Sequence, residues 1–273
     1  MRIVRQVTQH KDAVIGVAFH DLSTGDTLFV NADDSFHAAS TMKVPVMIEL
    51  YRLLDAGHLR LDQPIPLANR FKSIVDGSPF TLDPADDSDS AAYQLIGKRV
   101  TVAELVEHMI TRSSNLATNT LIDLVGAKEA NATAHALGAR DIRVLRGVED
   151  GKAFRAGMNN TTTARDLATL MEAIETGRAA SRASCDSMRS VLLRQEFNSE
   201  IPAGLPPGTR VAHKTGWITG VLNDAAVVYP PGHRPYVLVV LTRGIPDEAV
   251  ARQLIADVSR LVYAHVVNSR GHQ

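Results

Sequence analysis

The 273-residue sequence predicts an α+β fold, in which strands from both chain ends form one antiparallel sheet flanked by helices. β-rich segments occur near the N-terminus and again after residue 209, whereas helical periodicity fills the middle of the chain. We therefore expect a discontinuous α/β lobe of residues 1–39 and 196–273, with residues 40–195 inserted as an all-helical lobe. A cleft between two such lobes is a common place for a ligand site.

Two strands are expected close to the N-terminus. Residues 14–19 (VIGVAF) and 27–30 (TLFV) are rich in β-branched and aromatic side chains. The segment between them contains Gly25, which suits the loop of an antiparallel hairpin.

The middle of the chain has the signals of several helices. An apolar stripe begins at Ser40 and ends before Gly57, and Thr101 with Glu104 forms a capping-box pattern ahead of a helix over 102–111. Further helices are expected over 116–125, 129–137, 164–175 and 184–194.

Strand patterns return after Pro206-Pro207-Gly208. Strands are expected over 210–214, 224–229 and 236–242, and a last amphipathic helix over 246–264. Because the strands lie at both ends of the chain, they are expected to join in one sheet.

The composition excludes several classes of protein. Apolar residues make up 45% and charged residues 22%, which is typical of a folded globular chain. A formal net charge of −1 argues against nucleic-acid binding. The longest strongly apolar run, residues 236–241, is too short to span a membrane, and the single cysteine, Cys185, excludes an internal disulfide. We expect a monomer that acts on a small molecule, with Cys185 buried on a helix.

Two further segments give expectations of their own. Residues 1–21 lack a continuous apolar stretch, so a periplasmic or secreted location requires that a signal peptide was removed from this sequence. The acidic stretch with Asp83, Asp86, Asp87 and Asp89 lacks the regular spacing of a calcium loop, and we expect a solvated loop there.

Three short motifs carry residues that could do chemistry. In Ser40-Thr41-Met42-Lys43, the spacing at the start of a helix places a hydroxyl and an amine on one face, within hydrogen-bond reach. A lysine of lowered pKa can activate a serine nucleophile by taking its proton. Ser113-Ser114-Asn115 lies in a loop between two expected helices, and Lys214-Thr215-Gly216 ends an expected strand. Signatures of α/β-hydrolases, zinc proteases and nucleotide binders are missing.

The order of these motifs resembles the penicillin-recognising serine hydrolases, and within them the class A β-lactamases, over nearly the whole chain. The resemblance implies a β-lactamase/transpeptidase-like fold and hydrolysis of a β-lactam amide through an acyl-enzyme, without a metal or organic cofactor. It implies that Ser40 is the nucleophile, Lys43 its activator and Ser113 a proton relay. The implied substrate-binding residues are Asn115, Lys214, Thr215, Gly216 and Trp217.

The resemblance also implies finer roles. The backbone N–H groups of Ser40 and Trp217 would form the oxyanion hole, while the indole of Trp217 could equally belong to the core or to the substrate wall. Glu149 would activate the deacylating water. The chain has Ala153 where the family usually has an asparagine, and Asn159 or Asn160 are the candidates to replace it.

Other features at the expected site differ from the family or stay open. Asn223 lies near the position of an arginine that often supports the substrate carboxylate. His213 is the only histidine expected near the site. Each histidine is expected to lie either on the surface or in the core with its ring hydrogen-bonded.

Two other functions stay open. A D-alanyl-D-alanine peptidase or esterase on the same scaffold would deacylate β-lactams slowly. A sensor that only binds cell-wall fragments would have no need of Lys43, Ser113 and Lys214 together.

Overall fold

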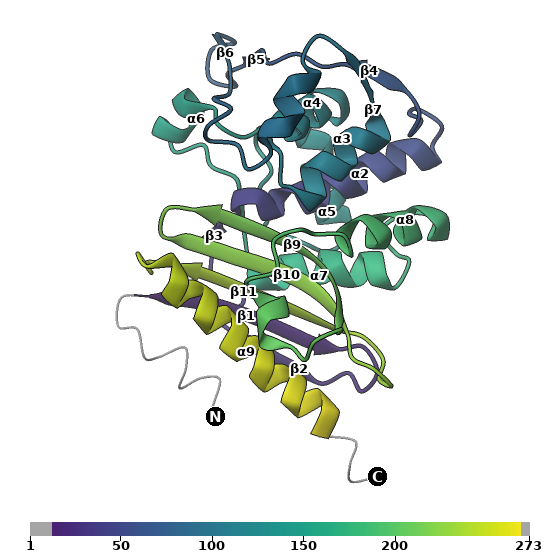
Figure 1. Ribbon diagram of the computed structural model, residues 1–273, viewed down its shortest axis with the longest axis vertical. Helices are drawn as coiled ribbons and strands as arrows, with labels where there is room; N and C mark the ends of the chain where they lie inside the picture. The colour runs from purple at the N-terminus through teal and green to yellow at the C-terminus, as the bar shows by residue number, and fades with distance from the viewer. Residues whose placement is uncertain (1–12, 269–273) are drawn as a thin grey trace.

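The computed structural model describes residues 13–268, and strands from both chain ends form one antiparallel sheet in it (Figure 1). The strand order is β2-β1-β11-β10-β9. These strands are β1 (Val14–Asp21), β2 (Thr27–Val30), β9 (Arg210–Ile218), β10 (Val221–Tyr229) and β11 (Tyr236–Arg243). The register pairs Val14 of β1 with Arg243 of β11, which confirms that the two ends of the chain share the sheet.

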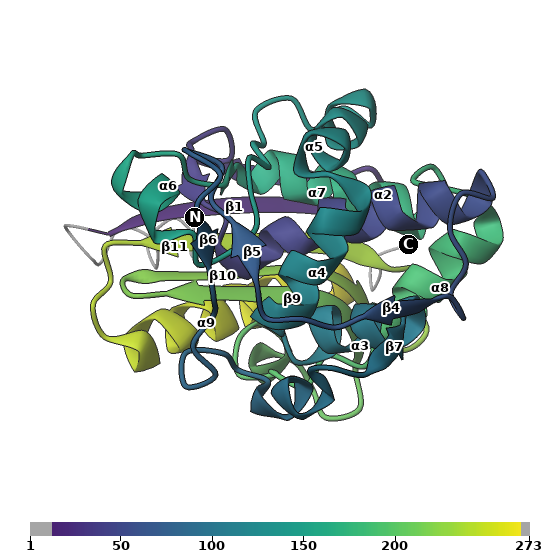
Figure 2. The ribbon, with the colours of Figure 1, turned by 90° about the horizontal axis from the view of Figure 1, so that it is seen from above.

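The sheet is covered on both faces, which explains the apolar run in β11. Leu238 and Val240 pack in one cluster with side chains of helix α9 (Glu248–Asn268), whereas Val239 and Leu241 join the larger core on the opposite face. A strand that is buried on both sides has no polar alternation, so its sequence reads as one apolar segment. Helix α9 crosses one face of the sheet (Figures 1 and 2).

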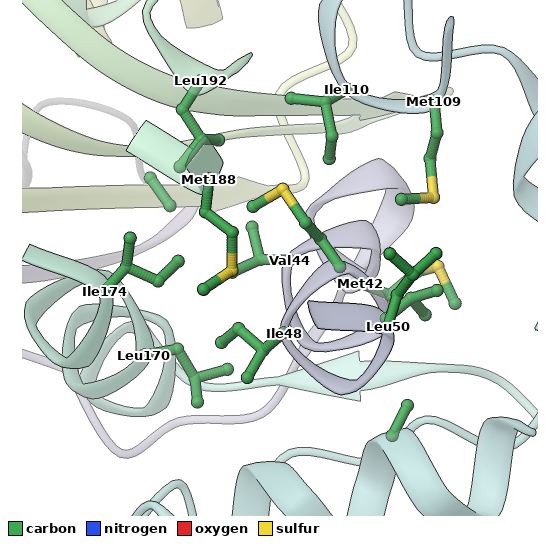
Figure 3. Close-up of a cluster of buried hydrophobic side chains, with 14 of the residues drawn as sticks. Met42, Val44, Ile48, Leu50, Met109, Ile110, Leu170, Ile174, Met188 and Leu192 are labelled. Carbon is green, nitrogen blue, oxygen red and sulfur yellow. The ribbon is translucent and has the colours of Figure 1, made fainter. Parts of the chain in front are cut away.

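Helix α2 (Lys43–Asp55) is the centre of the helical part of the molecule. Its first nine residues are all buried, and Val44, Ile48 and Leu50 contribute to a dense apolar cluster (Figure 3). Burying each such side chain stabilises the fold by about 1.5–3 kcal/mol. The surrounding helices include α3 (Val102–Thr111), α4 (Asn115–Val125), α5 (Ala127–Ala136) and α8 (Arg182–Leu192).

Helix α7 (Ala164–Glu175) packs directly against strands β1, β10 and β11, and α8 contacts β9 (Figure 1). Helices from the expected inserted segment therefore also cover the sheet. The division of the chain at residues 39 and 195 stays a prediction.

Several short elements have no clear sequence signal. They are β3 (Phe36–His37) with β8 (Thr161–Thr162), β4 (Pro64–Pro66) with β7 (Arg99–Thr101), β5 (Phe71–Lys72) with β6 (Pro79–Phe80), the 3-10 helices η1 (Ala39–Met42), η2 (Ser90–Leu95) and η3 (Ile201–Gly204), and α6 (Gly151–Arg155). Strands of two or three residues are too short to show a period.

Several expected boundaries shift: the strand expected over 224–229 begins at Val221, and the last helix, expected over 246–264, spans Glu248–Asn268. Two other shifts concern the candidate site. The helix expected from Ser40 begins as η1 and becomes α-helical at Lys43. The strand expected to end at Lys214 continues to Ile218, because residues 215–218 pair with residues 221–224 of β10. The Lys-Thr-Gly motif therefore lies inside a strand.

Other expectations have mixed outcomes. Cys185 is buried in α8 as predicted. The prediction of a solvated acidic loop is wrong in part, since Asp87 and Asp89 are buried and hydrogen-bonded. No helix within residues 13–268 is long and apolar enough to cross a membrane. The start of the segment considered as a signal peptide, residues 1–12, lies outside the described residues.

Candidate active site

Ser40 lies in η1, directly before the central helix α2, and is half-buried. The preceding residue, Ala39, has a φ of 46°, in the left-handed region that non-glycine residues rarely adopt. Hydrogen bonds fix this turn: Thr41 Oγ1 donates to the carbonyl of Ala38 at 2.6 Å, and Asn223 Nδ2 donates to the carbonyl of His37 at 2.9 Å. The backbone around the serine is therefore held from two sides.

The amine of Lys43 is fully buried and directed at the Ser113 loop. Its Nζ donates to the Ser113 carbonyl at 2.6 Å, to Ser113 Oγ at 3.1 Å and to Asn115 Oδ1 at 3.2 Å. No hydrogen bond joins Ser40 and Lys43 within the described chain, although both come from the same helical turn. In place of the expected contact with Ser40, the Lys43 amine has three acceptors on Ser113 and Asn115, about 70 residues further along the chain.

Lys214 approaches the same hydroxyl from the sheet. Its buried Nζ donates to Ser113 Oγ at 3.0 Å and to the carbonyl of Thr215 at 2.8 Å. Ser113 has a φ of 58°, so an uncommon backbone conformation presents its side chain to both lysines. Lys43 of the first motif and Lys214 of the third motif thus both donate a hydrogen bond to Ser113 of the second motif.

Both amines have lowered pKa values. Burial, followed by the charge of Lys214, holds the pKa of Lys43 well below its ordinary value of 10.5, against the opposing carboxylates of Asp87 and Glu149. Burial also lowers the pKa of Lys214 to about 7, although Asp224 and Glu200 oppose the shift. A lysine that is partly neutral near pH 7 can accept a proton.

Asn115 begins helix α4, and a buried carboxylate holds this helix end. Asp87 Oδ2 accepts hydrogen bonds from the backbone N–H groups of Asn115 at 2.9 Å and Leu116 at 3.0 Å, and from Tyr93 Oη at 3.0 Å. A carboxylate is stabilised at a helix N-terminus, where backbone N–H groups lack partners. Asp87 therefore anchors the loop that presents Ser113.

The third motif passes very close to Ser40. A Cβ atom placed on Gly216 would lie 2.9 Å from the backbone nitrogen of Ser40 and 3.0 Å from that of Thr41. Only glycine fits here, which brings β9 against η1. Thr215 is buried, whereas the following Trp217 is 55% exposed, so its indole belongs to the cleft wall and not to the core.

Glu149 lies at the mouth of the cleft with a φ of 59°. Burial of its carboxyl, and then the charge of Asp86, raise its pKa above the ordinary value, while Arg146 and Lys43 act in the opposite direction. A carboxylate of raised pKa is a better general base.

One cavity of about 400 Å³ brings the expected residues together. Its lining includes Ser40, Asn115, Glu149 and Trp217. Lys43, Ser113, Lys214 and Thr215 are buried beside it, within the hydrogen-bond network described above. All nine predicted site residues therefore gather at one cleft, although their roles stay predictions.

Comparisons with known proteins show the family to which the chain belongs. The sequence profile of the beta-lactamase enzyme family matches residues 1–266. The chain belongs to the beta-lactamase enzyme family. A β-lactamase of Streptomyces fradiae is 28% identical over 264 residues, covering 95% of this chain and 83% of the relative.

Two solved structures extend the comparison. A variant of the last common ancestor of Gram-negative bacteria β-lactamase class A is 28% identical, with a TM-score of 0.83 and coverage of 100% and 98% of the two chains. A mutant of PBP-A, an acyl-enzyme complex with penicillin G, is 31% identical, with a TM-score of 0.81 and coverage of 96% and 94%. The resemblance to class A enzymes is confirmed, and the chain is a serine β-lactamase-type hydrolase.

Two family-typical positions are occupied differently in this β-lactamase family member. Asn223 is fully buried, and it supports the turn before Ser40 through the carbonyls of His37 and Ala38. Its amide is therefore committed to the backbone that precedes Ser40 and does not stand in for a substrate-binding arginine.

The two asparagines proposed to compensate for Ala153 also have structural partners. Asn160 Oδ1 accepts from the N–H groups of Leu145 and Arg146, and its Nδ2 donates to the Arg146 carbonyl. Asn159 Oδ1 accepts from the Arg146 guanidinium. These contacts hold together the two ends of the loop that carries Glu149.

Several cleft residues were missed at the sequence level. His37, Arg146 and Phe154 line the cavity. His37 is thus a second histidine near the site, and its Nδ1 accepts a hydrogen bond from Ala39 N–H at 3.0 Å. His213 is a satisfied core residue as predicted, since its buried ring contacts Asp224 Oδ1 at 3.0 Å. His37 lies three residues before Ser40, which is the only signal that could have identified it.

No group of three or more His, Cys, Asp or Glu side chains within residues 13–268 is arranged to hold a metal ion. A reaction that needs no cofactor stays a prediction.

Proposed function

We propose that this protein hydrolyses the β-lactam amide of penicillin-type antibiotics through an acyl-enzyme on Ser40. The observation that carries the proposal is the convergence of Lys43 and Lys214 on Ser113 Oγ, beside a cavity lined by Ser40 and Glu149. The acyl-enzyme that PBP-A forms with penicillin G supports the same chemistry for this fold.

In the acylation step, Ser40 Oγ attacks the lactam carbonyl carbon while the neutral amine of Lys43 takes its proton. The lowered pKa of Lys43 supports this role. The C–N bond breaks, and the lactam nitrogen receives a proton relayed by Ser113, whose hydroxyl contacts both lysines. The backbone N–H groups of Ser40 and Trp217 stabilise the oxyanion.

Substrate binding uses the Lys214 ammonium and the Thr215 hydroxyl to receive the substrate carboxylate. Asn115, which accepts a hydrogen bond from Lys43 at 3.2 Å, orients that amine and the substrate amide. Gly216 supports this arrangement because its lack of a side chain lets β9 approach the backbone of Ser40.

In the deacylation step, Glu149 takes a proton from water, and the resulting hydroxide attacks the ester carbonyl. The ester bond breaks, and the proton returns to Ser40. Because the pKa of Glu149 is raised, the deacylation rate should fall on acidification at a pH above the ordinary carboxyl range. We propose that the reaction takes place outside the cytoplasm, where the drugs and the cell wall meet.

The test is intact-protein mass spectrometry after mixing with excess benzylpenicillin, sampled from seconds to hours. The wild-type protein should show an adduct that disappears as penicillin is consumed. Ser40→Ala should show no adduct, whereas the exposed control Ser199→Ala should behave as wild type. Glu149→Gln should accumulate the adduct. Labelling of Ser40→Ala would overturn the nucleophile, and a wild-type adduct that lasts for hours would favour a peptidase or a sensor.

A further inference from the structure

The backbone of Glu149 is held in an unfavourable conformation. A φ of 59° places this non-glycine residue in the left-handed region, at a cost of about 1–2 kcal/mol. Such a conformation persists only where neighbouring contacts determine it. The residues on either side of Glu149 therefore hold its backbone in this conformation.

The residue before Glu149 is anchored by a buried amide. Asn119 Nδ2 donates to the Val148 carbonyl at 2.9 Å, and Val148 N–H donates to Asn119 Oδ1 at 2.7 Å. Asn119 is 2% exposed and belongs to helix α4. This pair of bonds fixes the chain entering Glu149.

The residue after Glu149 is anchored by a different part of the molecule, the turn between β5 and β6. Asp150 is 3% exposed. Its carboxylate accepts from Ser73 Oγ at 3.0 Å and from Ile74 N–H at 2.9 Å, and it also caps helix α6 through Ala153 N–H at 3.1 Å. Hydrogen bonds to a charged acceptor are about twice as strong as neutral ones.

Ionisation of Asp150 fits this arrangement. Burial acts to raise its pKa, but the N–H donors of Ala153 and Ile74 and the Ser73 hydroxyl outweigh it, so the pKa lies below the ordinary value. All three donors point at the carboxylate, which needs no proton of its own.

We infer that Asp150 is a positioning residue for deacylation: it ties the Glu149 backbone to the Ser73–Ile74 turn and so aims the Glu149 carboxyl at the acyl-enzyme. The inference rests on the proposed role of Glu149. Asp150 acts through Glu149, because its own oxygens are occupied by Ser73, Ile74 and Ala153.

A second contact between the same segments serves as the matched control. Lys152 Nζ donates to Asp76 Oδ2 at 2.6 Å and to Ser78 Oγ at 2.7 Å, but both charged side chains are about half exposed. Exposed ion pairs contribute little. Lys152→Ala should change the deacylation rate by no more than about twofold.

The experiment measures acylation and deacylation separately with benzylpenicillin. Asp150→Ala should slow deacylation by about 10- to 100-fold, since small displacements of a catalytic group have effects of this size, and should leave acylation within about threefold. Asp150→Asn keeps one acceptor oxygen and should recover part of the rate. Ser73→Ala removes a single hydroxyl donor to Asp150 and should show a smaller loss of deacylation rate. This variant replaces Asp150→Ala as the test if Asp150→Ala does not fold.

Two readouts separate positioning from a general loss of structure. In a Glu149→Gln background, Asp150→Ala should add almost nothing to the deacylation defect. In the single variant Asp150→Ala, the acidic limb of the deacylation pH profile should move toward the ordinary carboxyl range, because Glu149 leaves the surroundings that raise its pKa.

Different results would contradict the role proposed for Glu149 and the role proposed for Asp150. Wild-type deacylation by Glu149→Gln would overturn the role of Glu149. If Glu149→Gln is slow, three results would overturn the role of Asp150: wild-type deacylation by Asp150→Ala, an equal loss of acylation and deacylation, or full additivity with Glu149→Gln.

Discussion

Lys43 and Lys214 direct their amines at one oxygen, with Nζ atoms 3.1 and 3.0 Å from Ser113 Oγ. Both amines are buried, and two full positive charges so close together in the interior would be unfavourable. The pKa of Lys43 is therefore held well below its ordinary value, and burial lowers that of Lys214 to about 7. This geometry is the basis of the roles proposed for the two amines, Lys43 as proton acceptor and Lys214 as the group that holds the substrate carboxylate.

Lys43→Arg should reduce the acylation rate by about 100-fold or more, because a guanidinium stays protonated and cannot take the Ser40 proton. In the wild type, acylation should rise with pH through the pKa of Lys43, which lies well below its ordinary value of 10.5. Acylation rates from pH 5 to 9 test this. The exposed control Lys98→Arg should leave the profile unchanged, and normal acylation by Lys43→Arg would show that another base acts.

Lys214→Met should stabilise the protein at low pH while weakening substrate binding. The folded-state pKa of about 7 lies below the ordinary value of 10.5, so between these values the unfolded chain binds more protons and wild-type stability rises with pH. Below pH 7 the amine of Lys214 is charged in the folded protein, and the cost of burying this charge lowers wild-type stability by its full amount. The stability of the variant relative to wild type should therefore fall by on the order of 4 kcal/mol between pH 6 and pH 10.

Urea unfolding at pH 6, 8 and 10 measures this difference. Lys72→Met, which removes an amine at an exposed position, is the control variant. A pH-independent difference for Lys214→Met would contradict the lowered pKa.

Gly216→Ala should reduce acylation by about tenfold or more, because the added Cβ would lie 2.9 Å from the Ser40 backbone nitrogen and force β9 away from η1. Acylation kinetics test it, together with a melting curve to verify folding. Arg210→Ala, at the exposed start of the same strand, is the control. Unimpaired acylation by Gly216→Ala would mean that this close approach is not required.

Asp87→Ala should lower both the stability and the acylation rate. Removing this carboxylate leaves the N–H groups of Asn115 and Leu116 without their acceptor at a buried helix end, at a cost of about 1–3 kcal/mol. Asp83→Ala, in the same acidic stretch but exposed, should cost less than about 0.5 kcal/mol. Equal effects of the two variants in denaturant unfolding would contradict the anchoring role of Asp87.

The sequence alone determined the class of the fold and the family, and it named the residues that gather at the cleft. Runs of β-branched and other apolar residues placed β1, β2, β10 and β11, and a capping box placed α3, because these signals are local and extend over a full element. Three motifs in order indicated the family before any contact was known.

Only the tertiary structure decided which groups meet and which are buried. Lys43 and Ser113 are 70 residues apart, and Lys214 and Ser113 are 101 residues apart, so no local pattern reports their shared hydrogen bonds. The sequence could not distinguish the buried Asp87 from the exposed Asp83, since burial depends on how distant segments pack. The same reason hid the tie between Asp150 and the Ser73–Ile74 turn, because long-range packing and not residue type creates that contact.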